Sequence, residues 1–305
     1  MMRLGLCCIL RTQTIKFRRI SSARLQKYKD SGGDPFEVLS RLIVRNVKAL
    51  KKAIIFCSHN NIGSFRVTSR FFPLYAHKKF PYTLDELQDE EKIYTILAEC
   101  RELAARNNIR LTLQPDKNVV LDSSQLEVVK KAINNLEYQA VIADLIGSDT
   151  IVVGAGCADD KHFAMRRLAS HLDYLSSSVR KRIAFENDDK SYTPEALLGF
   201  CRKKNVSFMY DIHHHRCFPD ELSVDDVTAM ALETWEDREP LFRISSPIDG
   251  WSGERLTRHH DFVDIADFPD EWKKLDSVTV EVDAKAREEA VIKLRKDLID
   301  DGAAL

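Results

Sequence analysis

The chain has 305 residues, of which 44% are hydrophobic and 30% are charged. These values are typical of a globular protein, and they exclude a disordered or collagen-like chain. Lys and Arg number 46 and Asp and Glu number 47, so the formal net charge is −1. The overall charge gives no indication of a nucleic-acid binder, and any basic binding surface has to be local.

The seven cysteines do not form a CxxC pair, which excludes a zinc ribbon and a thioredoxin-type redox motif. The apolar run at residues 4–10 is short for a signal peptide, and Arg11 ends it without a small-residue cleavage site. The sequence has no apolar stretch of the roughly 20 residues that a membrane span needs. We therefore predict a cytoplasmic protein that does not act at a membrane.

Short apolar runs alternate with longer segments along the whole chain. Between the first two runs, Phe36, Leu39, Ile43, Val47, Leu50 and Ile54 recur every three or four residues, which is the period of an amphipathic helix. Residues 126–140 repeat this spacing, and Thr193 followed by Pro194 is typical of a helix start. The eight candidate strands are residues 4–10, 64–69, 109–114, 150–154, 182–187, 206–211, 241–246 and 277–283.

This alternation predicts an α/β fold, a single (β/α)8 TIM barrel over residues 1–305. A doubly wound open sheet is the alternative, but the first strand is not followed by the glycine-rich phosphate loop that would favour it. Residues 246–272 are too long for an ordinary connection, and we expect a functional loop after the seventh strand.

Polar residues collect at the ends of the predicted strands, where such barrels carry their active sites. They are Gln114, Glu186 with Asn187 and Asp188, Asp211 with His213 and His214, Arg243, and either Glu281 or Asp283, and loops add His77, His215, His259 and His260. Carboxylate and imidazole groups that converge from several strands would bind a divalent metal. Each group also has a plainer interpretation: residues 213–215 as a solvated loop, residues 186–189 as a turn, and Glu281 with Asp283 as a solvated strand edge.

The basic residues also form local clusters. Residues 16–29 follow the first strand on the predicted functional face, where they either contact phosphates or are simply solvated. Residues 180–182 and 202–204 are expected at helix ends on the opposite face, where cations complement the helix dipole.

Several long segments resemble the UV damage endonuclease family. They are FRVTSRFFPLYAH (65–77), LQPDKNVVLDS (113–123), FENDDKSYT (185–193), YDIHHHRCFPDELSV (210–224), LFRISSPIDGWSG (241–253), HHDFVDIADFP (259–269) and VTVEVDAKARE (278–288). The resemblance implies a (β/α)8 barrel that nicks duplex DNA 5′ of ultraviolet photoproducts. It also implies a cluster of divalent metal ions, often manganese.

The resemblance further assigns roles to individual residues. It implies that the metal ligands are His77, Glu186, Asp211, His214, His259 and Asp283. Glu186, Asp211, Arg243 and Lys117 are the expected catalytic residues, with Arg243 or Lys117 stabilising the negative charge that develops at phosphorus. Lys117, Asn118 and Gln114 are the expected DNA contacts, because the first two stand where the family has residues that probe the duplex.

Three positions depart from the family pattern. Gln114, Val153 and Arg243 stand where the family has histidine ligands, so one metal ion is plausible here and a full cluster is not. Arg243 is expected instead to neutralise Glu186, Asp211 and Asp283.

Three functions remain open from the sequence. The first is a repair endonuclease that acts on damaged double-stranded DNA with a divalent metal, most simply manganese, in a reduced site. The second is a DNA-binding protein of the same family that does not nick. The third is a metal-dependent isomerase of small sugars, which would need a closed, small pocket. No obligate protein partner is evident.

Overall fold

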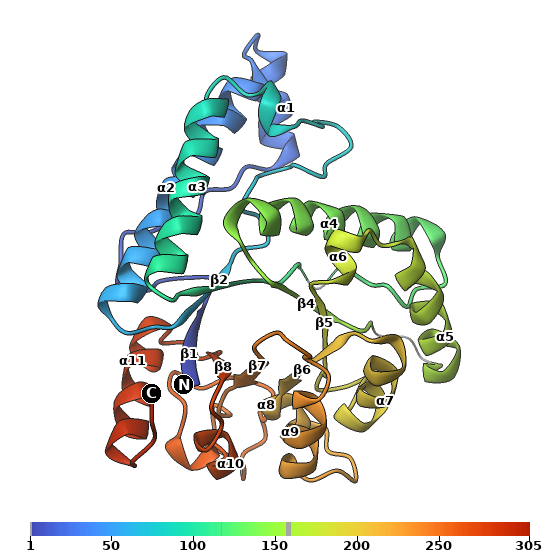
Figure 1. Ribbon diagram of the computed structural model, residues 1–305. Coiled ribbons are helices and arrows are strands. Elements are labelled where there is room, and N and C mark those ends of the chain that lie inside the picture. The colour runs from blue at the N-terminus through green and yellow to red at the C-terminus, as the bar shows by residue number, and fades with distance from the viewer. Residues whose placement is uncertain (1, 117, 157–159) are drawn as a thin grey trace.

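The computed structural model describes residues 2–116, 118–156 and 160–305. In these ranges parallel strands form a closed ring, in which each strand pairs with the next along the chain and β1 pairs with β8 (Figure 1). The predicted (β/α)8 barrel is confirmed, and the open doubly wound sheet is wrong. The strands are β1 (Met2–Cys7), β2 (Ser64–Val67), β3 (Arg110–Leu113), β4 (Thr150–Gly154), β5 (Ile183–Glu186), β6 (Ser207–Asp211), β7 (Leu241–Ile244) and β8 (Val278–Val282).

Each predicted strand is present, but most end earlier than the apolar pattern suggests. The first run, residues 4–10, shows why. The strand stops at Cys7 because Cys8 has a φ of 55°, a left-handed conformation that breaks the ladder. Leu10 is nevertheless buried, so the hydrophobic pattern continues beyond the strand.

Helices connect the strands and surround the ring. The helices are α1 (Ser22–Asp30), α2 (Pro35–His59), α3 (Glu90–Arg106), α4 (Leu126–Ile146), α5 (Lys161–His171), α6 (Ser177–Arg180), α7 (Pro194–Lys204), α8 (Ile212–Cys217), α9 (Val224–Leu232), α10 (Asp270–Lys273) and α11 (Glu288–Asp300). Short 3₁₀ turns occur at η1 (Leu84–Glu86), η2 (Leu172–Tyr174) and η3 (Ile265–Asp267). The long helices α2 and α3 lie side by side (Figure 1).

Helix α2 illustrates how the sequence determines these elements. The Asp34 side chain accepts a hydrogen bond from the Phe36 backbone N–H, and Pro35 occupies the first turn, where its missing N–H costs nothing. Five of the six positions of the predicted apolar stripe, from Leu39 to Ile54, are fully buried, and the sixth, Phe36, is partly buried. They form the side of the helix that covers α3 and β2.

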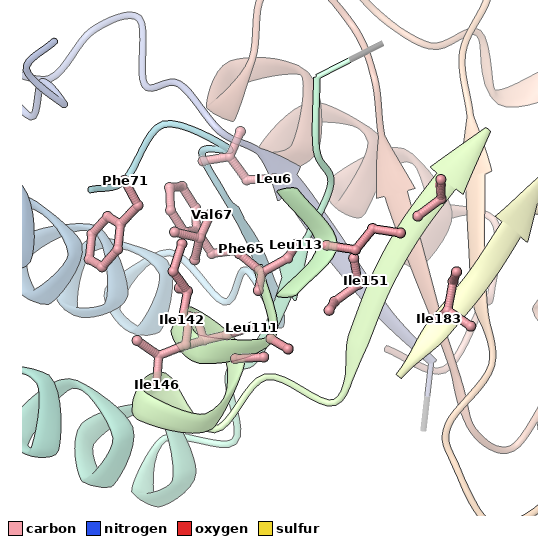
Figure 2. Packing of buried hydrophobic residues seen from close by; sticks show 14 of the residues in the cluster. Leu6, Phe65, Val67, Phe71, Leu111, Leu113, Ile142, Ile146, Ile151 and Ile183 are labelled. Atoms are coloured by element: carbon pink, nitrogen blue, oxygen red, sulfur yellow. The ribbon is translucent and has the colours of Figure 1, made fainter. Parts of the chain in front are cut away.

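The outward-facing strand residues form the main hydrophobic core beneath the helices. In Figure 2, Ile142 and Ile146 of α4 lie beside Leu111 of β3, and Phe65 and Val67 of β2 lie nearby. Because side chains alternate along a strand, the neighbours of these residues point into the barrel. The two-residue alternation along the strands therefore separates an apolar outer layer from an inner layer that carries the polar groups.

The end of the barrel where the strands begin is closed by Trp235. Its indole is buried among inward-facing residues of β4, β5, β6 and β7, and its Nε1–H donates to the Phe208 carbonyl at 2.9 Å. The guanidinium groups of Arg110 and Arg238 lie 5.7 and 5.1 Å from the ring centroid, within the range of cation–π attraction. This end is packed, which leaves the opposite end for chemistry.

The basic runs at residues 180–182 and 202–204 lie at the ends of α6 and α7, next to the starts of β5 and β6, as predicted. Arg182 donates to the Ser148 carbonyl at 3.0 Å, so this run is part of the scaffold. Among the residues that the structure describes, no helix has the length and apolar character needed to cross a membrane.

Candidate metal centre

The carboxyl ends of the strands open into a cavity of about 670 Å³. The last inward-facing residues of β3, β5, β6, β7 and β8, or the residues just after them, form its wall. They bring together most of the site residues that the sequence predicts, namely Gln114, Glu186, Asp211, His214, Arg243, His259 and Asp283. Side chains more than 160 residues apart in the sequence thus meet in a single space.

Glu186, Asp211 and His214 form a group that could hold a metal ion. Each offers one ligand atom, and these atoms lie within 4.8 Å of one another. Glu186 is the last residue of β5 and Asp211 is the last residue of β6, while His214 lies in the first turn of α8. Two carboxylates and an imidazole are a suitable donor set for a borderline divalent cation such as Mn²⁺ or Zn²⁺.

Local hydrogen bonds fix this group in place. Asp211 is also the N-cap of α8, and its Oδ1 accepts from the His214 backbone N–H at 2.9 Å. The Asn187 side chain bridges the Asp211 backbone, because its Oδ1 accepts from the Asp211 N–H and its Nδ2 donates to the Asp211 carbonyl, both at 2.9 Å. The β6–α8 junction is therefore rigid before any ligand arrives.

The His214 ring lies beside a carbonyl and a carboxylate. Its Nδ1 is 3.0 Å from the Asn187 carbonyl oxygen and 3.4 Å from Asp211 Oδ2. Because a carbonyl oxygen only accepts, Nδ1 carries a proton in this arrangement, and in the neutral ring Nε2 is the nitrogen with a free lone pair for a metal ion. The residues present thus fit one divalent ion.

The three consecutive histidines have different environments. All three lie in helix α8, so the interpretation of residues 213–215 as a solvated loop is wrong. His215 is buried between the Tyr210 hydroxyl, 2.7 Å away, and Asp220, 3.2 Å away. His213 is buried against the His259 ring, and only His214 reaches the carboxylates.

Arg243, the inward residue of β7, lies among the carboxylates. Its Nη1 bonds to Glu186 Oε1 and lies 3.9 Å from Asp211 Oδ2, while its Nη2 donates to Glu281 Oε2 at 2.8 Å. Nη2 also donates to the Gln114 amide oxygen at 3.1 Å, and Gln114 Nε2 donates to Glu186 Oε2 at 2.7 Å. The two substituted positions, 114 and 243, are therefore joined in one network around Glu186.

A second arginine, Arg66 on β2, belongs to the same network, and the sequence analysis missed it. Its Nη1 donates to Glu281 Oε2 at 3.1 Å and to the Gln114 amide oxygen, and its Nη2 lies 3.4 Å from Asp283 Oδ2. Position 66 is the inward neighbour of Phe65 and Val67, so strand alternation alone would have placed it in the barrel. A single arginine within an apolar strand was the sequence feature that could have identified Arg66 as a site residue.

The acidic residues of β8 point inward, so the alternative of a solvated strand edge is wrong. Glu281 is fully buried and also accepts from the Thr112 hydroxyl at 2.8 Å. Asp283 lies 3.8 Å from the His259 ring nitrogen Nδ1. Its guanidinium partner within the barrel is Arg66, whereas Arg243 makes its ion pairs with Glu186, Asp211 and Glu281. Burial acts to raise the pKa of the Asp283 carboxyl, but the His259 hydrogen bond, Arg66 and Arg243 lower it well below its usual value. Arg243 thus contributes to neutralising Asp283 without a direct ion pair.

Burial and charge act in opposite directions on the ionisable groups of the centre. Burial raises the pKa of the Glu186 carboxyl, and the Arg243 guanidinium opposes that shift without cancelling it. Burial also acts to raise the pKa of Asp211, but His214 and Arg243 outweigh it and the pKa is lowered. For His214, burial favours the neutral ring, yet Asp211 and Glu186 raise its pKa. Asp211 is thus the more firmly ionised carboxylate.

Comparison with known proteins agrees with this geometry. A family model described as UV-endonuclease UvdE matches residues 2–302. The chain belongs to the UV-endonuclease family. It is 28% identical to the UV DNA damage endonuclease of Nostoc sp. over 309 aligned residues, which cover 96% of this chain and 89% of that protein. It is also 28% identical to the UV DNA damage endonuclease of Deinococcus radiodurans, covering 96% of this chain and 94% of the relative.

Among solved structures, the crystal structure of SacUVDE has a TM-score of 0.87 and covers all of both chains at 23% identity. This likeness shows that the two chains share the same barrel fold. The resemblance found in the sequence is therefore confirmed as family membership.

Other residues predicted from the family pattern lie elsewhere. His77 follows β2, its Nδ1 accepts from the Lys79 N–H at 3.1 Å, and it is not among the described residues that line the cavity. Val153, in contrast, lines the cavity, although its side chain packs in the hydrophobic core and has no ligand atom to offer. Asn118 is exposed in a turn, and Lys117 lies outside the described residues.

Proposed function

We propose that this chain is a metal-dependent DNA repair endonuclease, which nicks duplex DNA on the 5′ side of ultraviolet photoproducts. The observation that carries the proposal is the convergence of Glu186, Asp211 and His214 in the cavity of a UV-endonuclease barrel. The relatives are named UV DNA damage endonucleases, which supports damaged double-stranded DNA as the substrate. Manganese is the cation we would supply first.

Glu186, Asp211 and His214 would hold the ion, and His259 with Asp283 would complete the adjoining wall of the site. A divalent cation supplies Lewis-acid chemistry, in that it activates water and neutralises charge on the phosphoryl group. Asp211 stays ionised as a ligand because its pKa is lowered. Asn187 keeps both Asp211 and His214 in position, so these two ligands need little rearrangement on binding.

Arg243 is best described as a positioning residue. Its guanidinium is buried and already bonded to Glu186, Glu281 and Gln114, so it acts on the phosphoryl group through the carboxylates that it holds. Direct stabilisation of the charge that develops at phosphorus falls to other cations at the rim of the cavity, for which Lys117 stays the prediction from the sequence.

The rim of the cavity carries basic side chains suited to a phosphate backbone. Arg19, from the basic run at residues 16–29, is exposed and lines the cavity. Arg70 also lines it and is exposed, although Asp116 pairs with it at 2.9 Å. Contacts of this kind would hold a duplex in register without reading its sequence. They favour a nucleic acid over a small sugar as the substrate.

The test is a nicking assay on supercoiled plasmid, irradiated or not, with the purified chain and Mn²⁺. We expect relaxed plasmid only from irradiated DNA, and we expect Glu186→Gln to abolish it. Glu99→Gln is the matched control, because Glu99 is an exposed glutamate on α3 that pairs with Lys51 on α2. An end-labelled duplex with one photoproduct then gives the position of the nick.

Two outcomes would refute the proposal. Binding of irradiated DNA without nicking, with any divalent cation tried, would favour the DNA-binding protein. Neither binding nor nicking would favour the isomerase, and its substrates would then be tested. Nicking equal in the Glu186→Gln variant would point to a contaminating nuclease.

A further inference from the structure

The inner layer of the barrel at the metal centre contains two fixed cations. Four carboxylates face inward here, those of Glu186, Asp211, Glu281 and Asp283, and the guanidinium groups of Arg66 and Arg243 lie between them. Both arginines are buried, with side chains 9% and 5% exposed. Because both guanidinium groups are buried and ion-paired, they are permanent parts of the metal centre.

Each arginine lies between two of these carboxylates. Arg243 bridges Glu186 and Glu281, and Arg66 bridges Glu281 and Asp283. Glu281 is thereby bonded to both guanidinium groups and to the Thr112 hydroxyl. An ion placed between Glu186 and Glu281 would have to displace Arg243, because both positive charges would compete for the same oxygens.

One further group of ligands contacts Arg243 through Nη1 alone, which bonds to Glu186 Oε1 and lies 3.9 Å from Asp211 Oδ2. Among the described residues, Glu186, Asp211 and His214 are the set whose ligand atoms come close enough together to share an ion. Glu186 can serve both partners, because each carboxylate oxygen has two lone pairs.

The net charge of the inner layer also favours a single divalent ion. Four carboxylates facing two buried guanidinium groups leave two negative charges when the histidines are neutral. A third arginine, Arg287, pairs with Asp283 at 3.5 Å, but its side chain is 30% exposed, so its charge is partly screened by solvent. One divalent cation balances that excess. Two or more would leave the buried layer with a net positive charge, which is costly in a low-dielectric environment.

We infer that Arg66 and Arg243 serve as built-in cations in the places that further metal ions would need, so that the centre binds a single divalent ion at Glu186, Asp211 and His214. This inference deepens the proposed function and relies on it for the presence of a metal. The arginines set the number of ions, and the ligand group sets where the ion lies.

The experiment measures Mn²⁺ stoichiometry on metal-stripped protein by isothermal titration calorimetry, with elemental analysis after desalting. We expect one Mn²⁺ per wild-type chain, none in Glu186→Gln, and two in Arg243→Gln, where the freed oxygens of Glu186 and Glu281 face each other. Arg255→Gln is the matched control. It also frees a carboxylate, that of Asp249, but at an exposed position, and it should still bind one ion.

Arg66→Gln provides a second variant if Arg243→Gln does not fold. The Mn²⁺ stoichiometry of the wild-type chain does not depend on the folding of either variant. Two or more ions per wild-type chain, with one lost in Glu281→Gln, would overturn the inference. A stoichiometry that stays at one in both folded arginine variants would also overturn it. Wild-type protein that binds one Mn²⁺ but never nicks would refute the proposed function alone, and wild-type protein that binds two and nicks would refute the inference alone.

Discussion

Replacing Arg243 by methionine should destabilise the protein through one buried carboxylate. The substitution removes the guanidinium from Glu186, Asp211 and Glu281. Asp211 keeps the His214 ring, whose Nδ1 lies 3.4 Å from its Oδ2. Glu281 keeps Arg66 at 3.1 Å and the Thr112 hydroxyl at 2.8 Å. Among the described residues, Arg243 is the one arginine or lysine in salt-bridge contact with Glu186, which would keep only the Gln114 amide.

The magnitude follows from that difference. Breaking a buried ion pair by removing one partner costs about 3–5 kcal/mol, because the remaining charge is left desolvated. Of the three carboxylates that lose Arg243, Glu186 is the one left without another ion-pair partner among the described residues. We therefore expect the Arg243→Met substitution to lower the free energy of unfolding by about that amount. Urea unfolding in EDTA, followed by circular dichroism, measures it.

The loss should also depend on pH. Burial already raises the pKa of Glu186 above its ordinary value of 4.5, and removing Arg243 would raise it further. The folded state then binds the proton more tightly than the unfolded state, so stability falls as pH rises from 4.5 through the folded-state pKa. The Arg243→Met loss should therefore be smaller at about pH 5 than at about pH 8.

Two further variants make this test decisive. Adding Glu186→Gln to Arg243→Met removes the unpaired charge and should recover much of the lost stability. Arg255→Met breaks an exposed pair with Asp249 and should leave the unfolding midpoint unchanged. A loss below about 1 kcal/mol for Arg243→Met at about pH 8, the size expected of a surface pair, would refute the reasoning.

Three other predictions follow from the structure. Trp235→Ala should cost about 3–5 kcal/mol in urea unfolding, because it empties the packed end of the barrel, while Mn²⁺ stoichiometry stays the same. Arg19→Gln should weaken binding to any duplex and reduce the slope of log affinity against log salt by about 1, measured by fluorescence anisotropy. Asn187→Ala should lower Mn²⁺ affinity in calorimetry by about 10–100-fold, because Asp211 and His214 lose their support, and excess Mn²⁺ should restore nicking.

Each of these predictions has an outcome that contradicts it. Equal stability of Trp235→Ala and Trp235→Phe would show that the ring contributes little to closing the barrel. Arg106→Gln, at the carboxyl end of α3 and away from the cavity, should not change DNA binding, and a change equal to that of Arg19→Gln would indicate a nonspecific charge effect. Unchanged Mn²⁺ affinity in Asn187→Ala would show that Asn187 is not needed to position Asp211 and His214.

Much of the fold could be predicted from periodicity, because burial on two faces requires apolar runs in strands and a 3.6-residue stripe in helices. The exact strand ends could not. The left-handed conformation at Cys8 depends on local packing, and an apolar pattern continues through it to Leu10.

The centre was predictable where a polar residue ends a strand, as Glu186 and Asp211 do. Arg66 was missed because it lies within β2 and not after its end, although its alternation with Phe65 and Val67 places it on the inner face. The choice of His214 from three consecutive histidines required the helix, since its first turn directs that ring toward the carboxylates and turns His213 and His215 into the core.

The positions of the three tryptophans determine what their fluorescence reports. The Trp235 indole lies at the sealed end of the barrel between two guanidinium groups, and Trp272 is buried among aromatic rings. Trp251 instead lies half-buried in the long loop after β7, against the His213 ring and near Arg216. Emission that changes when a metal or a duplex reaches the open end therefore reports Trp251, while emission from the other two follows unfolding of the barrel.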